Sequence, residues 1–125
     1  MKAKHFRDLQ VWQHSMSFAR SVYGLTQGYP QSEVFGLAQQ MRRAAVSIPS
    51  NIAEGHGRLS DKSFALFLSQ ARGSLNELET QLELSIQLGF IEAAQCVSAI
   101  QKIDELARML NALLTAVRRP STQSR

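Results

Sequence analysis

Apolar residues recur along this chain at spacings of three and four, which is the period of an amphipathic helix. Four segments carry the pattern: residues 8–26, 33–54, 61–88 and 92–119. No segment alternates like a strand, and the connections are short, so we predict an all-α fold, an antiparallel up-down-up-down four-helix bundle. We expect a single four-helix-bundle domain over residues 1–119 and a disordered C-terminal tail over residues 120–125.

Serine and glycine residues mark the predicted helix ends. Ser32 and Ser60 occupy N-cap positions, where a side-chain oxygen accepts a hydrogen bond from a free backbone N–H. Gly55 and Gly57 are expected to end the second helix and Gly89 the third, because glycine adopts the left-handed C-terminal conformation without a Cβ penalty.

The second helix contains an internal proline, and we predict a structural motif there that comprises Pro49, Asn51, Glu54 and Gly55. Pro49 lacks the N–H that would bond to the carbonyl four residues earlier, so we expect a bend, with Ser47 or Asn51 bonding to the freed carbonyl. Asn51 and Glu54 either hold a neighbouring helix or the following turn by hydrogen bonds, or line a site. In the third helix, Gly73 predicts a close approach between helices.

The first helix carries two apolar stripes. The first, which includes Trp12, Met16 and Tyr23, is expected to face the core. A surface helix of a single bundle needs only one such stripe, so the second either faces another helix of its own chain or, as we favour, another subunit. The predicted subunit interface, with two residues from the next segment, comprises Val11, Phe18, Val22, Leu25, Phe35 and Val46.

The net charge of +4 is unevenly distributed. Residues 1–75 have nine basic and four acidic side chains, whereas residues 76–117 have two basic and six acidic ones. Basic side chains neutralise phosphates, which predicts nucleic-acid binding without sequence reading. The candidates are Arg42, Arg43, Arg58, Lys62 and Arg72, with Lys2, Lys4, Arg7 and Arg20 as additional members. The alternative is a solvated face or an ion-pair face within the oligomer, because Arg43 shares a helical sector with Glu54 and Arg72 lies near the Glu79 and Glu83 side of its helix.

The sequence contains no motif typical of catalysis, metal binding or phosphate binding. His5, His14 and His56 are scattered, and no Glu-x-x-His motif occurs. Cys96 is the only cysteine, which excludes an internal disulfide and agrees with a reducing compartment. No apolar run approaches about 20 residues, and no secretory signal is present. We therefore predict a cytoplasmic protein that is not an enzyme, with no cofactor, no metal, no membrane association and no small-molecule substrate.

Several separated motifs carry a family resemblance. They are FRDLQVW at residues 6–12, the Tyr29–Pro30 pair followed by residues 33–40, SIPSNIAEG at residues 47–55 and GSLNELETQL at residues 73–82. Together they resemble the small four-helix-bundle proteins encoded in intervening sequences of bacterial 23S rRNA genes, over residues 6–114. The resemblance implies a cytoplasmic bundle that assembles as a ring, with five subunits as one expectation. More distantly, the chain is similar to the accessory variability proteins of diversity-generating retroelements, basic rings that bind nucleic acid and a reverse transcriptase. Neither resemblance implies catalytic residues.

These observations lead to two hypotheses about function. In the first, the protein is a basic homo-oligomeric adaptor that binds structured RNA or DNA. In the second, it is a protein-interaction scaffold whose partner is another polypeptide. They differ in salt dependence, because binding to phosphates weakens steeply as salt concentration rises.

Overall fold

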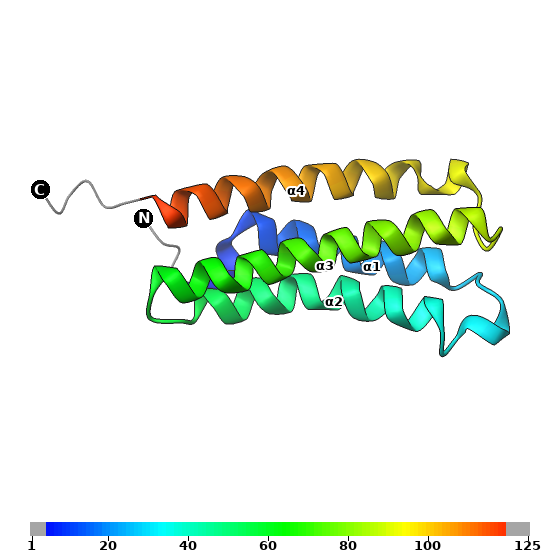
Figure 1. Ribbon diagram of the computed structural model, residues 1–125, viewed down its shortest axis with the longest axis horizontal. Coiled ribbons are helices and arrows are strands. Elements are labelled where there is room, and N and C mark those ends of the chain that lie inside the picture. Colours follow the sequence, from blue (N-terminus) through cyan, green and yellow to red (C-terminus); the bar gives the residue numbers. More distant parts are fainter. Residues whose placement is uncertain (1–4, 120–125) are drawn as a thin grey trace, which may run out of the picture.

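The computed structural model describes residues 5–119. Its long helices are α1 (Gln10–Thr26), α2 (Leu37–His56), α3 (Asp61–Gln87) and α4 (Val97–Arg118), and the short 3₁₀ helices are η1 (Phe6–Asp8), η2 (Gln31–Glu33) and η3 (Ala93–Cys96). Figure 1 shows the four long helices side by side, each antiparallel to the next. α1 also packs against α4, which closes the bundle. Residues 5–119 contain no strand, so the predicted all-α antiparallel four-helix bundle is confirmed.

One hydrophobic core fills the bundle, and all four helices share it. Its fully buried side chains include Phe18 of α1, Ile48 of α2, Leu75 of α3 and Leu106 of α4. Burial of such side chains stabilises the fold by about 1.5–3 kcal/mol each. The predicted tail, residues 120–125, lies outside the described residues.

The start of α2 differs from the prediction, because Ser32 does not cap it. Ser32 lies within η2, and α2 begins at Leu37 with Gly36 as the N-cap residue. The Glu33 Oε1 atom accepts a hydrogen bond from the backbone N–H of Leu37 at 2.9 Å. A carboxylate at this place satisfies a free N–H and also stabilises the positive end of the helix dipole.

The helix ends near glycine follow the prediction only in part. Gly89 has a φ of 79°, as predicted for a left-handed C-terminal glycine, and the Ser60 hydroxyl caps α3 by accepting from the N–H of Ser63 at 3.1 Å. Gly57 ends α2 with a φ of −78°, which is not left-handed. Gly55 lies inside α2 and does not end it. Gly55 is buried against α3, where a larger residue would collide with Phe64 and Phe67.

Close packing between helices occurs at Gly55 and not, as predicted, at Gly73. A Cβ atom on Gly55 would lie 2.6 Å from Cβ of Phe67 and 3.0 Å from Cδ1 of Phe64. A Cβ on Gly73 would meet no atom within 4 Å. Gly55 is therefore the position where a missing side chain lets α2 and α3 approach.

Pro49 is buried inside α2, which continues through it. The hydroxyl of Ser47 donates to the carbonyl of Ala44 at 2.7 Å and lies 2.6 Å from the hydroxyl of Ser74 on α3. The side-chain amide of Asn51 donates to the carbonyl of Ser47 at 2.8 Å. Neither side chain is hydrogen-bonded to the carbonyl freed by Pro49, which corrects that prediction, and Ser47 links α2 to α3.

α1 is rotated relative to the predicted orientation, so its two apolar stripes exchange places. Val11, Phe18 and Val22 are 5%, 1% and 2% exposed within a single chain, which corrects their assignment to a subunit interface. Met16 and Tyr23, predicted to face the core, are 37% and 45% exposed. The surplus apolar surface of α1 is real, but it is the other stripe that faces outward.

Two hydroxyl groups explain why the inward stripe was not recognised as core. Ser15 and Thr26 lie on this stripe and are buried. Ser15 donates to the carbonyl of Trp12 at 2.8 Å, and Thr26 donates to the carbonyl of Val22 at 2.8 Å. Because each hydroxyl is satisfied within its own helix, burying it carries little penalty.

Candidate binding surfaces

An apolar groove runs between α1 and α2 on the outside of the bundle. Its volume is about 610 Å³. The outward stripe of α1 and the facing side of α2 form it. Its lining residues are Phe6, Trp12, Met16, Ala19, Arg20, Tyr23, Val46, Pro49, Ser50 and Ala53. We call this feature the α1–α2 groove.

Contacts within the chain hold the aromatic walls of the α1–α2 groove. The rings of Phe6 and Trp12 meet edge to face, with centroids 5.2 Å apart. At the other end, the guanidinium of Arg42 lies over the ring of Tyr23 at 4.6 Å. Arg42 also donates from Nε to Oγ1 of Thr26 at 2.8 Å and from Nη2 to the carbonyl of Tyr23 at 3.2 Å. Because these contacts fix both ends, the groove exists before any partner binds.

Cations border the α1–α2 groove. Arg20 lines it and is exposed, and it lies between Met16 and Tyr23 on α1. Arg43 is exposed and precedes Val46 by three residues, which places both on the same side of α2. The groove therefore combines an apolar floor with a positive border, a composition suited to an apolar partner surface that carries acid.

A second groove of about 610 Å³ lies where the start of α3 meets the end of α4, and it is bordered by Lys62 and Arg118. Arg118 donates from Nη2 to the hydroxyl of Ser69 at 3.0 Å. Arg72 follows Ser69 by three residues on α3. Asp61 also lines this groove, in the first turn of α3, where it complements the helix dipole. We call Lys62, Arg72 and Arg118 the basic patch.

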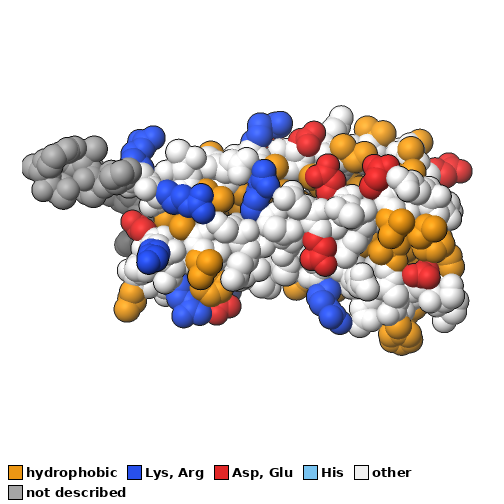
Figure 2. All heavy atoms as spheres, in the orientation of Figure 1, with side chains coloured by type: hydrophobic (Ala, Val, Ile, Leu, Met, Phe, Trp, Pro, Cys, Tyr) orange, Lys and Arg blue, Asp and Glu red, His pale blue; other side chains and the backbone are white. Residues whose placement is uncertain are grey.

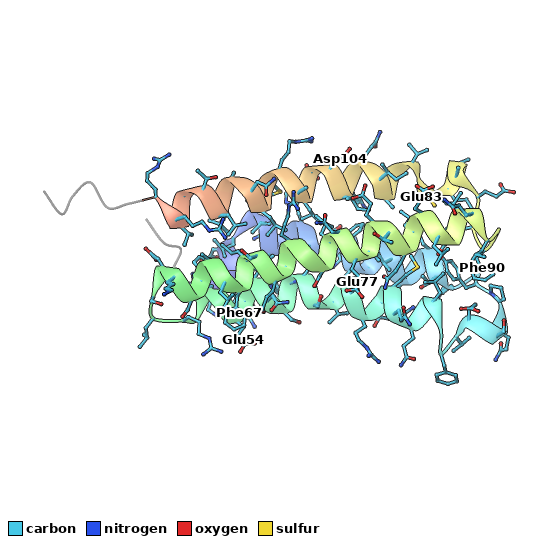
Figure 3. The ribbon with its side chains drawn as sticks, viewed as in Figure 1. Glu54, Phe67, Glu77, Glu83, Phe90 and Asp104 are labelled. Atoms are coloured by element: carbon cyan, nitrogen blue, oxygen red, sulfur yellow. The ribbon has the colours of Figure 1, made fainter. Side chains whose placement is uncertain are left out.

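Apolar and acidic side chains occupy the other half of the α3–α4 face. The exposed apolar residues are Leu84, Leu88, Val97 and Ile100. Glu83 on α3 and Asp104 on α4 accompany them, as Figure 3 shows. Figure 2 shows that Lys and Arg lie mainly over the half holding the start of α3, whereas Asp and Glu lie mainly over the opposite half. We call these six residues the acidic patch.

The five basic residues predicted to bind nucleic acid do not form one surface. Arg42 is hydrogen-bonded to Thr26 and to the carbonyl of Tyr23 on α1. Arg58 pairs with Glu54 at 2.8 Å and lies over the ring of Phe67 at 4.8 Å, although the sequence had placed Glu54 near Arg43. Arg43 is separated from Arg58 by roughly 20 Å of helix rise. Lys62 and Arg72 remain on one face, and the structure adds Arg118, which was not among the candidates predicted from the sequence.

The other predicted surface residues also separate. Lys2 and Lys4 lie outside the described residues, and Arg7 lies over the ring of Phe6 at 5.1 Å. Of the remaining predicted interface residues, Leu25 packs partly against the core, Phe35 is 86% exposed, and Val46 lines the α1–α2 groove. Most residues of this groove were therefore not predicted from the sequence, although the two apolar stripes of α1 were the signal for it.

The interior contains a small polar cluster at the end of the bundle opposite the basic patch. The hydroxyl of Tyr29 donates to Sδ of Met41 at 3.4 Å, and the hydroxyl of Ser85 lies 3.5 Å from the same sulfur. Burial raises the pKa of the Tyr29 hydroxyl and of the Cys96 thiol above their usual ranges. Both groups are therefore neutral near pH 7, so Cys96 is a buried thiol and not an activated nucleophile.

Within residues 5–119, no three His, Cys, Asp or Glu side chains lie close enough together to hold a metal ion. Across the same residues, no helix is long and apolar enough to cross a membrane.

The arrangement defines a class of protein, a small antiparallel four-helix bundle with an apolar groove on one side and a divided charge on another. The family profile described as "23S rRNA-intervening sequence protein" matches residues 7–112, and the chain belongs to this family. It is similar to the crystal structure of a protein of unknown function from the S23 ribosomal protein family of Bacteroides thetaiotaomicron. That similarity has 27% sequence identity and a TM-score of 0.74, and it covers 83% of this chain and 97% of the other. No curated protein matches the chain.

Proposed function

We propose that this protein acts by binding and not by catalysis, as a cytoplasmic self-associated bundle that presents its basic patch to structured RNA or DNA. The observation that supports this proposal most directly is the separation of charge on the α3–α4 face. Lys62 and Arg118 border one groove at the start of α3 and the end of α4, and Arg72 follows Ser69, which accepts a hydrogen bond from Arg118, by three residues on α3. Cations in such an arrangement attract phosphates and release bound counterions.

Self-association strengthens this binding. Three cations on one chain make few phosphate contacts, whereas several linked copies engage one nucleic acid at high effective concentration. The α1–α2 groove gives a reason for self-association, since exposed apolar surfaces of this kind mark interaction sites. The basic patch lies on a different pair of helices and remains accessible when the groove is covered.

The second candidate function is a scaffold for another polypeptide. One observation favours it: Arg42 and Arg58, two of the five predicted phosphate ligands, are engaged within the chain. In this case the α1–α2 groove receives a segment of the partner protein. A partner that stays bound in a pull-down after nuclease treatment at high salt would favour the scaffold over the nucleic-acid proposal.

A salt series tests the proposal. Binding of the wild-type protein to a structured rRNA fragment and to duplex DNA is measured by fluorescence anisotropy between about 50 and 200 mM salt, after its mass has been measured by light scattering. We expect a steep linear fall of log K with log salt. The variant with Lys62→Gln and Arg118→Gln should lose affinity and have a slope smaller by roughly 0.9 for each phosphate contact removed.

Arg108→Gln is the matched control, because Arg108 is an exposed cation of α4 outside the basic patch. Its slope should stay close to that of the wild type. Absence of binding at 50 mM salt, or binding that does not respond to salt, would exclude the proposal. Equal slopes for the wild type and the double variant would exclude the basic patch as the site.

A further inference from the structure

We propose that two copies join through unlike surfaces: the α1–α2 groove of one copy receives the acidic patch of the next. This inference rests on the proposed self-association and names the surface that occupies the groove. It follows from the apolar content of both surfaces and from their opposite charges.

The first surface is preformed. Met16, Tyr23 and Val46 present partly exposed apolar side chains to the α1–α2 groove. The exposed cations Arg20 and Arg43 stand along it. Arg42 also lies at one end of the groove, over the ring of Tyr23, whereas Glu54 and Arg58 neutralise each other in an ion pair. The border of the groove is therefore net positive.

The second surface has the complementary composition. Leu84 and Leu88 near the end of α3, and Val97 and Ile100 at the start of α4, are between 42% and 54% exposed. Figure 2 shows apolar side chains gathered over this end of the face, with acidic side chains beside them. Glu79 and Glu83 border a groove along α3 that also contains Leu84. This surface is apolar and net negative.

Charge decides between contacts of like and unlike surfaces. If two grooves met, Arg20 and Arg43 would approach copies of themselves. If two acidic patches met, Glu83 and Asp104 would do the same. Like charges brought together in an interface are unfavourable, whereas opposite charges steer association and fix the register. The contact of groove with patch covers both apolar surfaces and pairs their charges.

This geometry has a structural consequence. A contact between unlike surfaces is heterologous, so an open chain of copies keeps one groove free at one end and one acidic patch free at the other until a ring closes. Neither surface includes Lys62 or Arg118. The contact therefore uses neither of these two cations of the basic patch.

A charge exchange tests the inference. The groove variant carries Arg20→Glu and Arg43→Glu, and the patch variant carries Glu83→Lys and Asp104→Lys. Each should dissociate at concentrations at least tenfold higher than the wild type in sedimentation or light-scattering experiments. Mixing the two variants, or combining all four substitutions in one chain, should restore assembly because opposite charges face each other again. Lys62→Glu is the matched control and should assemble like the wild type.

Each outcome separates this inference from the proposal on which it rests. A wild-type protein that is monomeric at about 100 µM would overturn the self-association and the inference with it. An assembled wild type whose patch variant assembles normally would overturn the inference alone. Failure of the four-substitution chain to reassemble, with helical content retained by circular dichroism, would also overturn the charge pairing.

Discussion

Alanine substitutions at Gly55 and Gly73 should change stability in opposite directions, although both replace a glycine inside a helix. In Gly55→Ala, the new Cβ would lie 2.6 Å from Cβ of Phe67. Carbon atoms pack at about 3.5–4.0 Å, so α3 must recede by about 1 Å. Phe67 cannot avoid the contact by changing rotamer, because its Cβ is attached directly to the backbone.

The expected loss follows from two opposing effects. Overpacking of a well-filled site costs about 1–3 kcal/mol, and alanine recovers about 1 kcal/mol of helix propensity relative to glycine. The two effects leave a net loss of about 0–2 kcal/mol, and because the 2.6 Å contact is with a Cβ that cannot rotate away, we expect Gly55→Ala to lower the free energy of unfolding by the upper half of that range, roughly 1–2 kcal/mol. For a chain of this length that corresponds to a decrease in Tm of roughly 4–8 °C.

Gly73→Ala is the matched control. No atom lies within 4 Å of the position its Cβ would occupy, so only the propensity gain remains. We expect it to raise the free energy of unfolding by about 0.5–1 kcal/mol. Urea unfolding followed by circular dichroism measures both variants. The reasoning is wrong if Gly55→Ala is as stable as the wild type, or if Gly73→Ala is less stable.

Two further predictions concern stability. Arg42→Ala removes hydrogen bonds to Thr26 and to the carbonyl of Tyr23 at the end of α1, so we expect the free energy of unfolding to fall by about 1–3 kcal/mol. Arg43→Ala, at the exposed neighbouring position, should stay within about 0.5 kcal/mol of the wild type. Equal urea midpoints for the two variants would contradict this prediction. Burial raises the pKa of Cys96 and of Tyr29 in the folded protein. As pH rises, these groups therefore lose their protons in the unfolded chain before they do so in the folded one, which favours unfolding. The free energy of unfolding should fall above about pH 8.5 because of Cys96 and fall again above about pH 10 because of Tyr29. Tyr29→Phe should remove the second decrease. Urea midpoints of the wild type that do not change from about pH 8 to 11 would refute the assignment of these decreases to Cys96 and Tyr29.

The fold was predictable from the sequence because each helix repeats its apolar positions over several turns and the loops are short. The cap at Ser60 and the left-handed Gly89 were predictable because both depend on residues close in sequence. Ser32 was misassigned because the carboxylate of Glu33 caps α2 across an intervening turn. The distinction between Gly55 and Gly73 depends on the neighbouring helix, which local sequence does not specify.

The rotation of α1 decided how much of the candidate site could be predicted. Both stripes of this helix are apolar, so periodicity alone gives two orientations that differ little in buried area. The orientation found buries Ser15 and Thr26, whose hydroxyls bond within α1, and leaves Trp12 and Tyr23 at the surface, where aromatic residues with a polar group are common. The apolar surplus was therefore predictable, whereas the residues that form the groove were not.

The charge division depends on where the sign changes within the helices. The sequence divides near residue 75, which lies in the middle of α3, so Lys62 and Arg72 occupy one half of that helix and Glu79 and Glu83 the other. α4 runs in the opposite direction and changes sign in the opposite order, from Asp104 to Arg118. Because the two helices are antiparallel, charges of the same sign meet at the same end and add. Parallel helices with these sequences would cancel their charges, so the antiparallel topology itself produces separate basic and acidic patches.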